Sequence, residues 1–223
     1  RPVTKVNLGM YRKSLSIFQQ EKNVDPDQTL VIFEITLSNL MSTGVIDEQD
    51  FMDRANLLCS LGHIVMISNF KEYYKLAEYF SNYTTKKIRL TMGVSNLVEI
   101  FHEKYYRHLS GGILEAFGKL FFKNLKVYLY PMLHPETDKV IDSNNLKVHP
   151  RVKELYKFFK YNNKLVDILD YNKEDMRIYS RDVLELINLG KTGWEDMLPE
   201  GVSRLIKEQK LFGYHAELQK ALD

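Results

Sequence analysis

The residues most capable of chemistry in this sequence are three Ser-Asn pairs, each of which follows an apolar segment. The pairs are Ser38 with Asn39, Ser68 with Asn69, and Ser95 with Asn96. The interval from each pair to the next matches one strand plus one helix. In open α/β sheets, ligands bind beyond the carboxyl ends of the strands, where hydroxyls, amides and free helix amides can hold a phosphate. The pairs therefore predict a polar binding site at such an edge.

Helix capping is the alternative explanation of these pairs. Asn69 is followed three residues later by Glu72, and Asn96 is followed by Glu99. This is the spacing of a capping box, in which the two side chains satisfy free backbone amides. Asn39 has no acidic residue at the matching position, so the first pair is the stronger binding candidate. The other two pairs stay open between capping and binding.

Glu34 is the candidate catalytic residue. It lies within the apolar segment 30–37, and a period of two places it on the same face as Thr36 and Ser38. A carboxylate in such surroundings must find a partner or change its pKa. Arg89, in a later apolar segment, is the candidate partner. Two interpretations follow: a structural ion pair, or a general base or ligand anchor that faces the edge of the sheet.

Further residues could contact an anion. Gly111 and Gly112 precede a helical segment, and their amides could cradle a phosphate, although a flexible turn explains the same residues. Arg89 would add positive charge. Ser95 has the strand-to-helix context of a nucleophile elbow, but the second glycine of G-x-S-x-G is missing. The two common nucleotide-phosphate loops and the H-E-x-x-H motif are also missing, so any cofactor is unknown and no metal site is predicted.

The segments that must position these residues alternate between strands and helices. Strands are predicted over 30–37, 63–67, 88–92 and 126–130. Helices are predicted over 8–20, 47–61, 70–83, 97–106 and 113–122. This order is typical of an α/β fold with a mainly parallel sheet of about four strands and flanking helices. Residues 1–140 would form this α/β domain, and residues 141–223, with a helical period and no further strand, a C-terminal region packed on it.

Composition restricts the class of protein. The 223 residues include 31 Lys and Arg against 29 Asp and Glu, a net charge of +2. This balance argues against a nucleic-acid partner, and short clusters such as Lys86 and Lys87 with Arg89 are interpreted as solvated surface. Cys59 is the single cysteine, which excludes a disulfide framework, and we expect it to be buried. No apolar segment reaches 18 residues and no signal peptide is recognised, so we expect a cytoplasmic protein without a membrane partner.

Seven segments carry a resemblance to a known family. They are residues 1–7, 34–40, 67–74, 104–106, 110–118, 130–133 and 180–184. The Gly-Gly-Ile-Leu-Glu-Ala-Phe-Gly sequence at 111–118 is the most specific of them. Together they resemble the C-terminal half of a conserved bacterial family of longer proteins, over Arg1 to about Gly213. Because the chain begins at Arg1 without a methionine, the missing N-terminal part of the same protein is an expected partner.

The resemblance implies two labels that members of this family carry. One is nicotinate- or nicotinamide-nucleotide adenylyltransferase, which needs an H-x-G-H motif after its first strand. The only Gly-His here, Gly62 with His63, precedes a strand and lacks the other half of the motif. The other is TonB-dependent receptor, an outer-membrane barrel whose strand pattern this chain lacks. The resemblance supplies no catalytic residues.

Two hypotheses follow for function. The first is a cytoplasmic enzyme domain that binds a polar or phosphorylated small molecule at the carboxyl edge of a parallel sheet. The second is a non-catalytic docking or oligomerisation module, which includes self-association. Its hydrophobic anchors would come from the helical end: Trp194, Leu198, Leu205, Leu211 and Phe212. Burial of Trp194 and Phe212 within one chain would remove these anchors, and a closed-off Glu34 would count against the enzyme.

Overall fold

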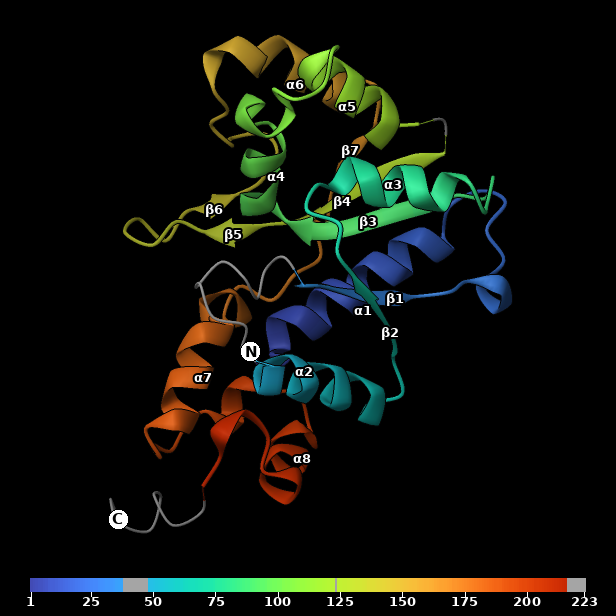
Figure 1. Cartoon of the computed structure of the whole chain (residues 1–223). Helices are drawn as coiled ribbons and strands as arrows, with labels where there is room; N and C mark the ends of the chain where they lie inside the picture. The colour runs from blue at the N-terminus through green and yellow to red at the C-terminus, as the bar shows by residue number, and fades with distance from the viewer. Residues whose placement is uncertain (38–47, 123, 216–223) are drawn as a thin grey trace. The chain divides into compact units, whose positions relative to one another are not determined.

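The computed structural model describes residues 1–37, 48–122 and 124–215 (Figure 1). Its larger sheets are parallel and flanked by helices, which confirms the predicted α/β class. The chain divides into two compact units. Unit 1 holds 1–15, the described part of 19–69, and 172–215, whereas unit 2 holds 16–18 and the described part of 70–171. The division predicted from the sequence, an α/β domain over 1–140 and a helical region over 141–223, stays a prediction.

Unit 1 contains a sheet of two parallel strands, β1 (Ile32–Thr36) and β2 (Ile64–Ser68). The helix between them is α2 (Glu48–Ser60), with Glu48 and Asp50 in its first turn, where carboxylates favour the helix dipole. Gly62 follows with a φ of 79°, a left-handed conformation that glycine adopts without a steric penalty. The helix predicted over 47–61 and the strands predicted over 30–37 and 63–67 are confirmed by α2, β1 and β2.

The core of unit 1 is helical. It uses α7 (Ser180–Asn188) and α8 (Val202–Gln209), which bury Val183, Ile187, Val202 and Ile206 at helical spacing. Trp194 lies in the same cluster. Unit 1 also contains four short 3-10 helices: η1 (Pro26–Gln28), η6 (Asp175–Arg177), η7 (Glu195–Met197) and η8 (Leu211–Gly213). The helices α7 and α8 therefore confirm the predicted helical character of this part of the chain.

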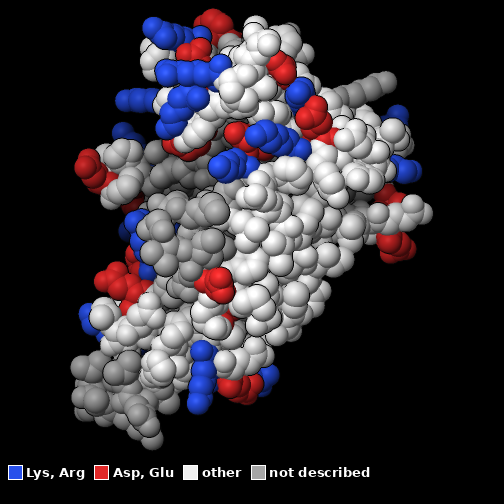
Figure 2. All heavy atoms as spheres, viewed as in Figure 1, with Lys and Arg blue, Asp and Glu red and all other residues white. Residues whose placement is uncertain are grey.

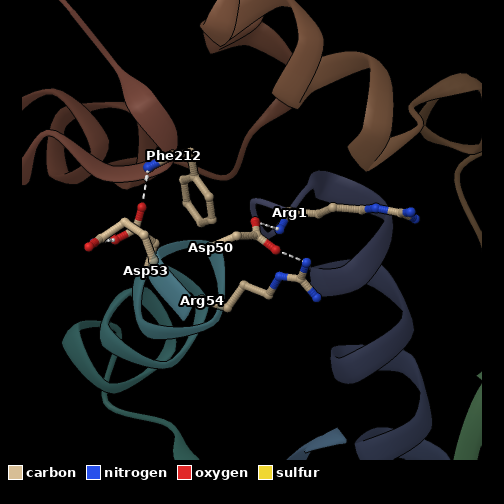
Figure 3. A network of polar contacts seen from close by, with 6 residues as sticks. Arg1, Asp50, Asp53, Arg54 and Phe212 are labelled. Atoms are coloured by element: carbon tan, nitrogen blue, oxygen red, sulfur yellow. Dashed lines mark hydrogen bonds and ion pairs between the residues drawn. The ribbon is translucent and has the colours of Figure 1, made fainter. Parts of the chain in front are cut away.

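A polar network joins α2 to the C-terminal turn of unit 1 (Figure 3). Asp53 is 1% exposed, accepts a hydrogen bond from Gln49 Nε2 at 2.7 Å, and accepts another from the backbone N–H of Phe212. One turn earlier, Asp50 contacts the guanidinium of Arg54. Phe212 has a φ of 57°, a left-handed conformation that is strained for an aromatic residue. The Asp53 carboxylate therefore satisfies a backbone amide within a strained turn.

Unit 2 contains a three-stranded parallel sheet in the order β3-β4-β7. Its strands are β3 (Ile88–Gly93), β4 (Leu125–Tyr130) and β7 (Leu165–Asp167). A small antiparallel pair follows, β5 (Met132–Leu133) with β6 (Val140–Ile141). The expectation of no further strand in residues 141–223 is wrong, because β7 and the last residue of β6 lie there. These strands have only two or three residues each and show no measurable period. The predicted strands thus belong to two parallel sheets and not to a single one.

The helices of unit 2 cover one face of this sheet. They are α3 (Tyr73–Ser81), α4 (Val94–Ile100), α5 (Gly112–Leu120) and α6 (Lys153–Tyr161), with η4 (Glu103–Tyr106) and η5 (Pro150–Val152). Phe117 of α5 and Phe159 of α6 pack with Val127 and Leu129 of β4 in one buried cluster. This cluster fixes the sheet that carries Arg89 on β3 and Asp167 on β7, which are described below.

Three further observations concern the described residues. The first helix of the chain, α1, spans Lys5–Gln19. Cys59 is exposed and not buried as expected, because the phase of α2 turns Leu57 and Leu58 inward instead. Within the described ranges, no helix combines the length and the apolar character that crossing a bilayer requires.

Candidate functional site

The structure brings two of the predicted site residues together in unit 1. Ser68 Oγ donates a hydrogen bond to Glu34 Oε1. The strand register explains this contact, because Glu34 pairs with Met66 and Thr36 pairs with Ser68. Residues at even offsets share a face, so the Ser68 side chain lies diagonally opposite Glu34 on the neighbouring strand. The partner of Glu34 that the structure describes is therefore a hydroxyl.

The Glu34–Ser68 pair lies at the carboxyl end of the sheet. Thr36 and Ser68 are the last residues of β1 and β2, and Glu34 is two residues before the end of β1. Ser68 is 8% exposed, whereas Glu34 is half-buried and keeps some access to solvent. This is the edge at which parallel sheets bind ligands, so the position agrees with the one predicted for a polar site.

Burial sets the protonation of Glu34. Removal of the carboxylate from water raises the pKa of Glu34 above its ordinary value of 4.5, and the hydrogen bond from Ser68 offsets part of that rise. The charged form is penalised because the surrounding strand is apolar. A carboxyl with a raised pKa exchanges protons closer to neutral pH, which is the property a general acid or base needs.

The raised pKa of Glu34 predicts a pH dependence of stability. The folded state keeps the Glu34 proton to a higher pH than the unfolded chain does, so it binds more protons in the window above pH 4.5. The contribution of Glu34 to the free energy of unfolding therefore falls as the pH rises through this window. Glu34→Gln, which cannot ionise, should remove this fall. Urea denaturation at a series of pH values from about 4 to about 7 measures it.

The control for this titration is Glu200→Gln, because Glu200 is an exposed residue of the same unit. This variant should reproduce the wild-type dependence on pH. Equal pH profiles for wild type and Glu34→Gln would contradict the assigned protonation of Glu34.

The other predicted Ser-Asn pairs have different places. Ser38 and Asn39 lie outside the described residues. Asn69 follows β2, but it does not cap α3, whose N-cap is Glu72. Ser95 and Asn96 lie inside the first turn of α4, whose N-cap is Gly93. The capping interpretation is therefore wrong for both described pairs, and they belong to two different sheets.

Arg89 occupies the opposite end of its strand from Ser95. It is the second residue of β3, and its Nη1 donates to the carbonyl oxygens of Ile88 at 2.7 Å and Asn124 at 2.8 Å. Gly93, the last residue of β3, is four positions further along the extended chain, a span of about 13 Å. Arg89 belongs to unit 2 and Glu34 to unit 1. The predicted ion pair between them stays a prediction.

The Gly111-Gly112 segment already holds a carboxylate. The backbone N–H of Gly111 donates to Glu115 Oε2 at 3.0 Å, and this bond is the main cause that lowers the pKa of Glu115. A Cβ on Gly111 would approach Glu115 Cβ to 2.8 Å, so the contact requires glycine. Gly112 opens α5 with a φ of 55°. A side chain of the protein itself thus occupies the amide predicted to bind an anion.

A polar cluster at the carboxyl end of β7 was not predicted. Asp167 accepts hydrogen bonds from the backbone N–H of Ser143 at 3.0 Å and from its Oγ at 2.6 Å. The carbonyl oxygen of Ser143 in turn accepts from Tyr156 OH at 2.6 Å and from Lys160 Nζ at 3.1 Å. The only sequence signal was an acidic residue directly after two apolar ones. This cluster fixes the loop that follows β6, because every one of these bonds ends on Ser143.

Four of the five anchors of the docking hypothesis are buried, and the fifth, Leu205, is partly buried. Trp194 is fully buried and Phe212 is 4% exposed, and Leu198 and Leu211 lie in the same cluster. Among the residues that the structure describes, no group of three or more His, Cys, Asp or Glu side chains is arranged to hold a metal ion. Comparisons with protein-family models, with curated proteins and with solved structures found no match to this chain.

Proposed function

We propose that this chain is a cytoplasmic enzyme domain that binds a polar or phosphorylated small molecule at the carboxyl edge of the β1–β2 sheet. Glu34 would transfer a proton to or from that molecule. The observation that carries this proposal is the Glu34–Ser68 hydrogen bond at the end of two parallel strands. A half-buried carboxyl with a raised pKa, placed at the edge where α/β proteins bind ligands, supports a role in general acid–base chemistry.

The two residues would have different roles. Ser68 holds Oε1 of Glu34, which orients the carboxyl group and leaves Oε2 as the oxygen that could exchange a proton with a ligand. Thr36, at the end of β1, adds a hydroxyl on the same face of the sheet. Ser68 is thus a positioning residue and Glu34 is the proposed catalytic residue.

The docking alternative has less support. Its proposed anchors, Trp194 and Phe212, are buried within unit 1 and therefore cannot offer an exposed hydrophobic surface to a partner. Glu34, in contrast, is half-buried and keeps the access to solvent that contact with a ligand requires. These two exposures favour the enzyme over the docking module.

A ligand screen with matched variants tests the proposal. Wild-type protein, Glu34→Gln and the exposed control Glu200→Gln are heated with a panel of nucleotides, sugar phosphates and polar metabolites. We expect at least one compound to raise the melting temperature of the wild type and of Glu200→Gln by several degrees, because a ligand that binds only the folded state stabilises it. The same compound should have little effect on Glu34→Gln.

Two results would contradict this expectation. In the first, no compound of these classes stabilises the wild type. In the second, a stabilising compound raises the melting temperature of Glu34→Gln as much as that of the control, which would place its site elsewhere. A third variant, Ser68→Ala, separates the roles, since it should weaken binding less than Glu34→Gln if Ser68 acts only by orienting the carboxyl group.

A further inference from the structure

Large hydrophobic side chains are exposed on the outer side of α5 and α6 in unit 2. On α6, Phe158 is 58% exposed and Tyr161, about one turn later, is 89% exposed. On α5, Leu114 is 67% exposed. Single exposed hydrophobic residues are common on protein surfaces, whereas a group of them marks an interaction surface. Their significance therefore depends on whether they adjoin one another.

The packing of the two helices brings these side chains to adjoining surfaces. Leu114, Gly118 and Phe121 are spaced four and three residues apart, so they form one stripe along α5 and its C-cap. Phe121 stacks on Phe159 of α6 with ring centroids 4.2 Å apart, and Phe158 contacts the same ring at 5.4 Å. Gly118 is exposed, and a Cβ there would meet nothing within 4 Å. Leu114 and Phe158 therefore border the same seam between α5 and α6.

Lysine side chains share the exposed face of α6 with the aromatic ones. Lys153, Lys157 and Tyr161 are spaced four residues apart, which places them on one stripe of the helix. Phe158 precedes Tyr161 by three residues and lies beside this stripe. All four side chains are exposed. The outer face of α6 thus combines two aromatic rings with two ammonium groups.

Positive charge is in excess around this face. Residues 145–163 contain five Lys and Arg residues and a single acidic one, Glu154, which pairs with the next lysine of α6 at 2.7 Å. Among the residues that the structure describes, Lys147, Arg151 and Lys153 are exposed and form no ion pair. Figure 2 shows Lys and Arg side chains gathered at the top of the view, over the part of unit 2 where Figure 1 labels α6. This face therefore keeps a net positive charge.

An anionic membrane surface matches this combination of groups. Aromatic side chains are favoured between the headgroups and the acyl chains, and basic residues beside them attract anionic headgroups. Leu114 favours a membrane over a single-stranded nucleic acid, because an aliphatic side chain enters the acyl region but cannot stack on a base as an aromatic ring does. Side chains as exposed as these protrude, and a fluid bilayer accepts them without a complementary pocket.

We propose that Leu114, Phe158, Tyr161 and the three unpaired cations beside them form a peripheral binding surface for anionic membranes, the α5–α6 surface. The apolar side chains would enter the interfacial layer, and the cations would contact lipid phosphates. The sequence-based expectation of no membrane partner rested on the lack of a spanning segment, and a peripheral contact requires none. The surface lies in unit 2 and does not depend on the function proposed for Glu34.

Flotation with lipid vesicles tests the α5–α6 surface. The protein is mixed at physiological ionic strength with vesicles of phosphatidylcholine alone or of phosphatidylcholine with phosphatidylglycerol. We expect the wild type to bind only the anionic vesicles. Phe158→Ser should weaken this binding about tenfold, because the interface loses a large apolar side chain. Lys153→Gln should weaken it about fivefold, the effect of one basic residue near an anionic surface.

Two exposed residues of the same unit provide matched controls. Tyr83 and Lys86 both lie between α3 and β3, outside the α5–α6 surface. Tyr83→Ser removes an aromatic ring and Lys86→Gln removes a charge, and both variants should bind vesicles as the wild type does. All four variants should melt at the wild-type temperature, because exposed side chains contribute little to stability. A much lower melting temperature for Phe158→Ser would show that Phe158 belongs to the core and would contradict the proposal.

The variant Tyr161→Trp measures insertion separately. Trp194 is fully buried, so its emission should not respond to vesicles. The new indole should shift to shorter wavelengths and become protected from iodide when anionic vesicles are added, and phosphatidylcholine alone should produce neither change. Binding to vesicles without this shift would exclude Tyr161 from the contact and contradict the assigned surface.

The proposal is wrong if the wild type does not bind anionic vesicles. It is also wrong if Phe158→Ser and Lys153→Gln bind as tightly as their controls. A single-stranded oligonucleotide and sedimentation of the free protein complete the test. If the two variants weaken oligonucleotide binding and not vesicle binding, the surface serves a nucleic acid. If they instead dissociate a dimer, its partner is a second copy of the chain.

Discussion

Replacing Trp194 with alanine should lower the free energy of unfolding by about 3–5 kcal/mol, the usual cost of removing a buried tryptophan. Trp194 is completely buried and packs with Tyr214 at a ring-centroid distance of 6.1 Å. Lys207 lies over its indole ring at 5.3 Å. The loss combines the hydrophobic area of the indole with the cavity it leaves behind. Urea denaturation, followed by circular dichroism, measures the change.

The control for Trp194 is Leu189→Ala in the same unit. Leu189 is 48% exposed, so its truncation should cost far less than that of Trp194. Trp194→Phe should fall between the two, because it keeps much of the apolar volume. A cost below about 1 kcal/mol for Trp194→Ala would show that this residue is not a core residue, and it would restore the docking hypothesis.

Replacing Asp53 with alanine should cost about 1–3 kcal/mol, because two hydrogen bonds to a buried carboxylate are lost together. The backbone N–H of Phe212 would have no acceptor in its place, although it lies in a buried part of the turn (Figure 3). That turn also contains Lys210 with a φ of 52°, so two left-handed residues, separated by Leu211, depend on the same anchor. We expect the C-terminal turn to loosen before the rest of unit 1.

Hydrogen exchange distinguishes this local effect from general destabilisation. In Asp53→Ala the amides of residues 210–214 should exchange much faster, while those of α7 should change by the global loss alone. Asp53→Asn keeps one acceptor oxygen and should lie between the wild type and Asp53→Ala. Glu208→Gln, at an exposed position of α8, is the matched control. Uniform exchange rates across unit 1 in Asp53→Ala would refute the assigned anchor.

Local patterns were sufficient to predict the long elements. The apolar, β-branched residues from Ile32 to Thr36 and from Ile64 to Ser68 predicted β1 and β2. Acidic residues at the start of α2 and Gly62 after its end marked that helix at both ends. These signals depend on neighbours in sequence, so one sequence is enough to recognise them.

Pairing between strands could not be predicted in the same way. β7 has three residues, and its identity depends on the open side of β4, where Val127 pairs with Leu165. The division of the strands into two sheets depends likewise on hydrogen bonds between distant segments. Nothing in the periodicity of a strand indicates which other strand will lie beside it.

The candidate site shows the same limit. Glu34 was identified from the sequence because a carboxylate within an apolar strand is costly, and the raised pKa agrees with that argument. Its hydrogen-bond partner, Ser68, was named for a different reason, since the strand register that brings the two together is a tertiary property.

The contact between Gly111 and Glu115 has a consequence for ligand selection. Glu115 is tethered four residues from the amide it contacts, so its carboxylate acts as an intramolecular ligand with a high effective concentration. A free anion that approached the start of α5 would have to compete with it. Dilute, weakly binding anions such as chloride or acetate would lose that competition. The protein thus supplies its own carboxylate ligand at this helix start, and only an anion that binds more strongly than this side chain could replace it.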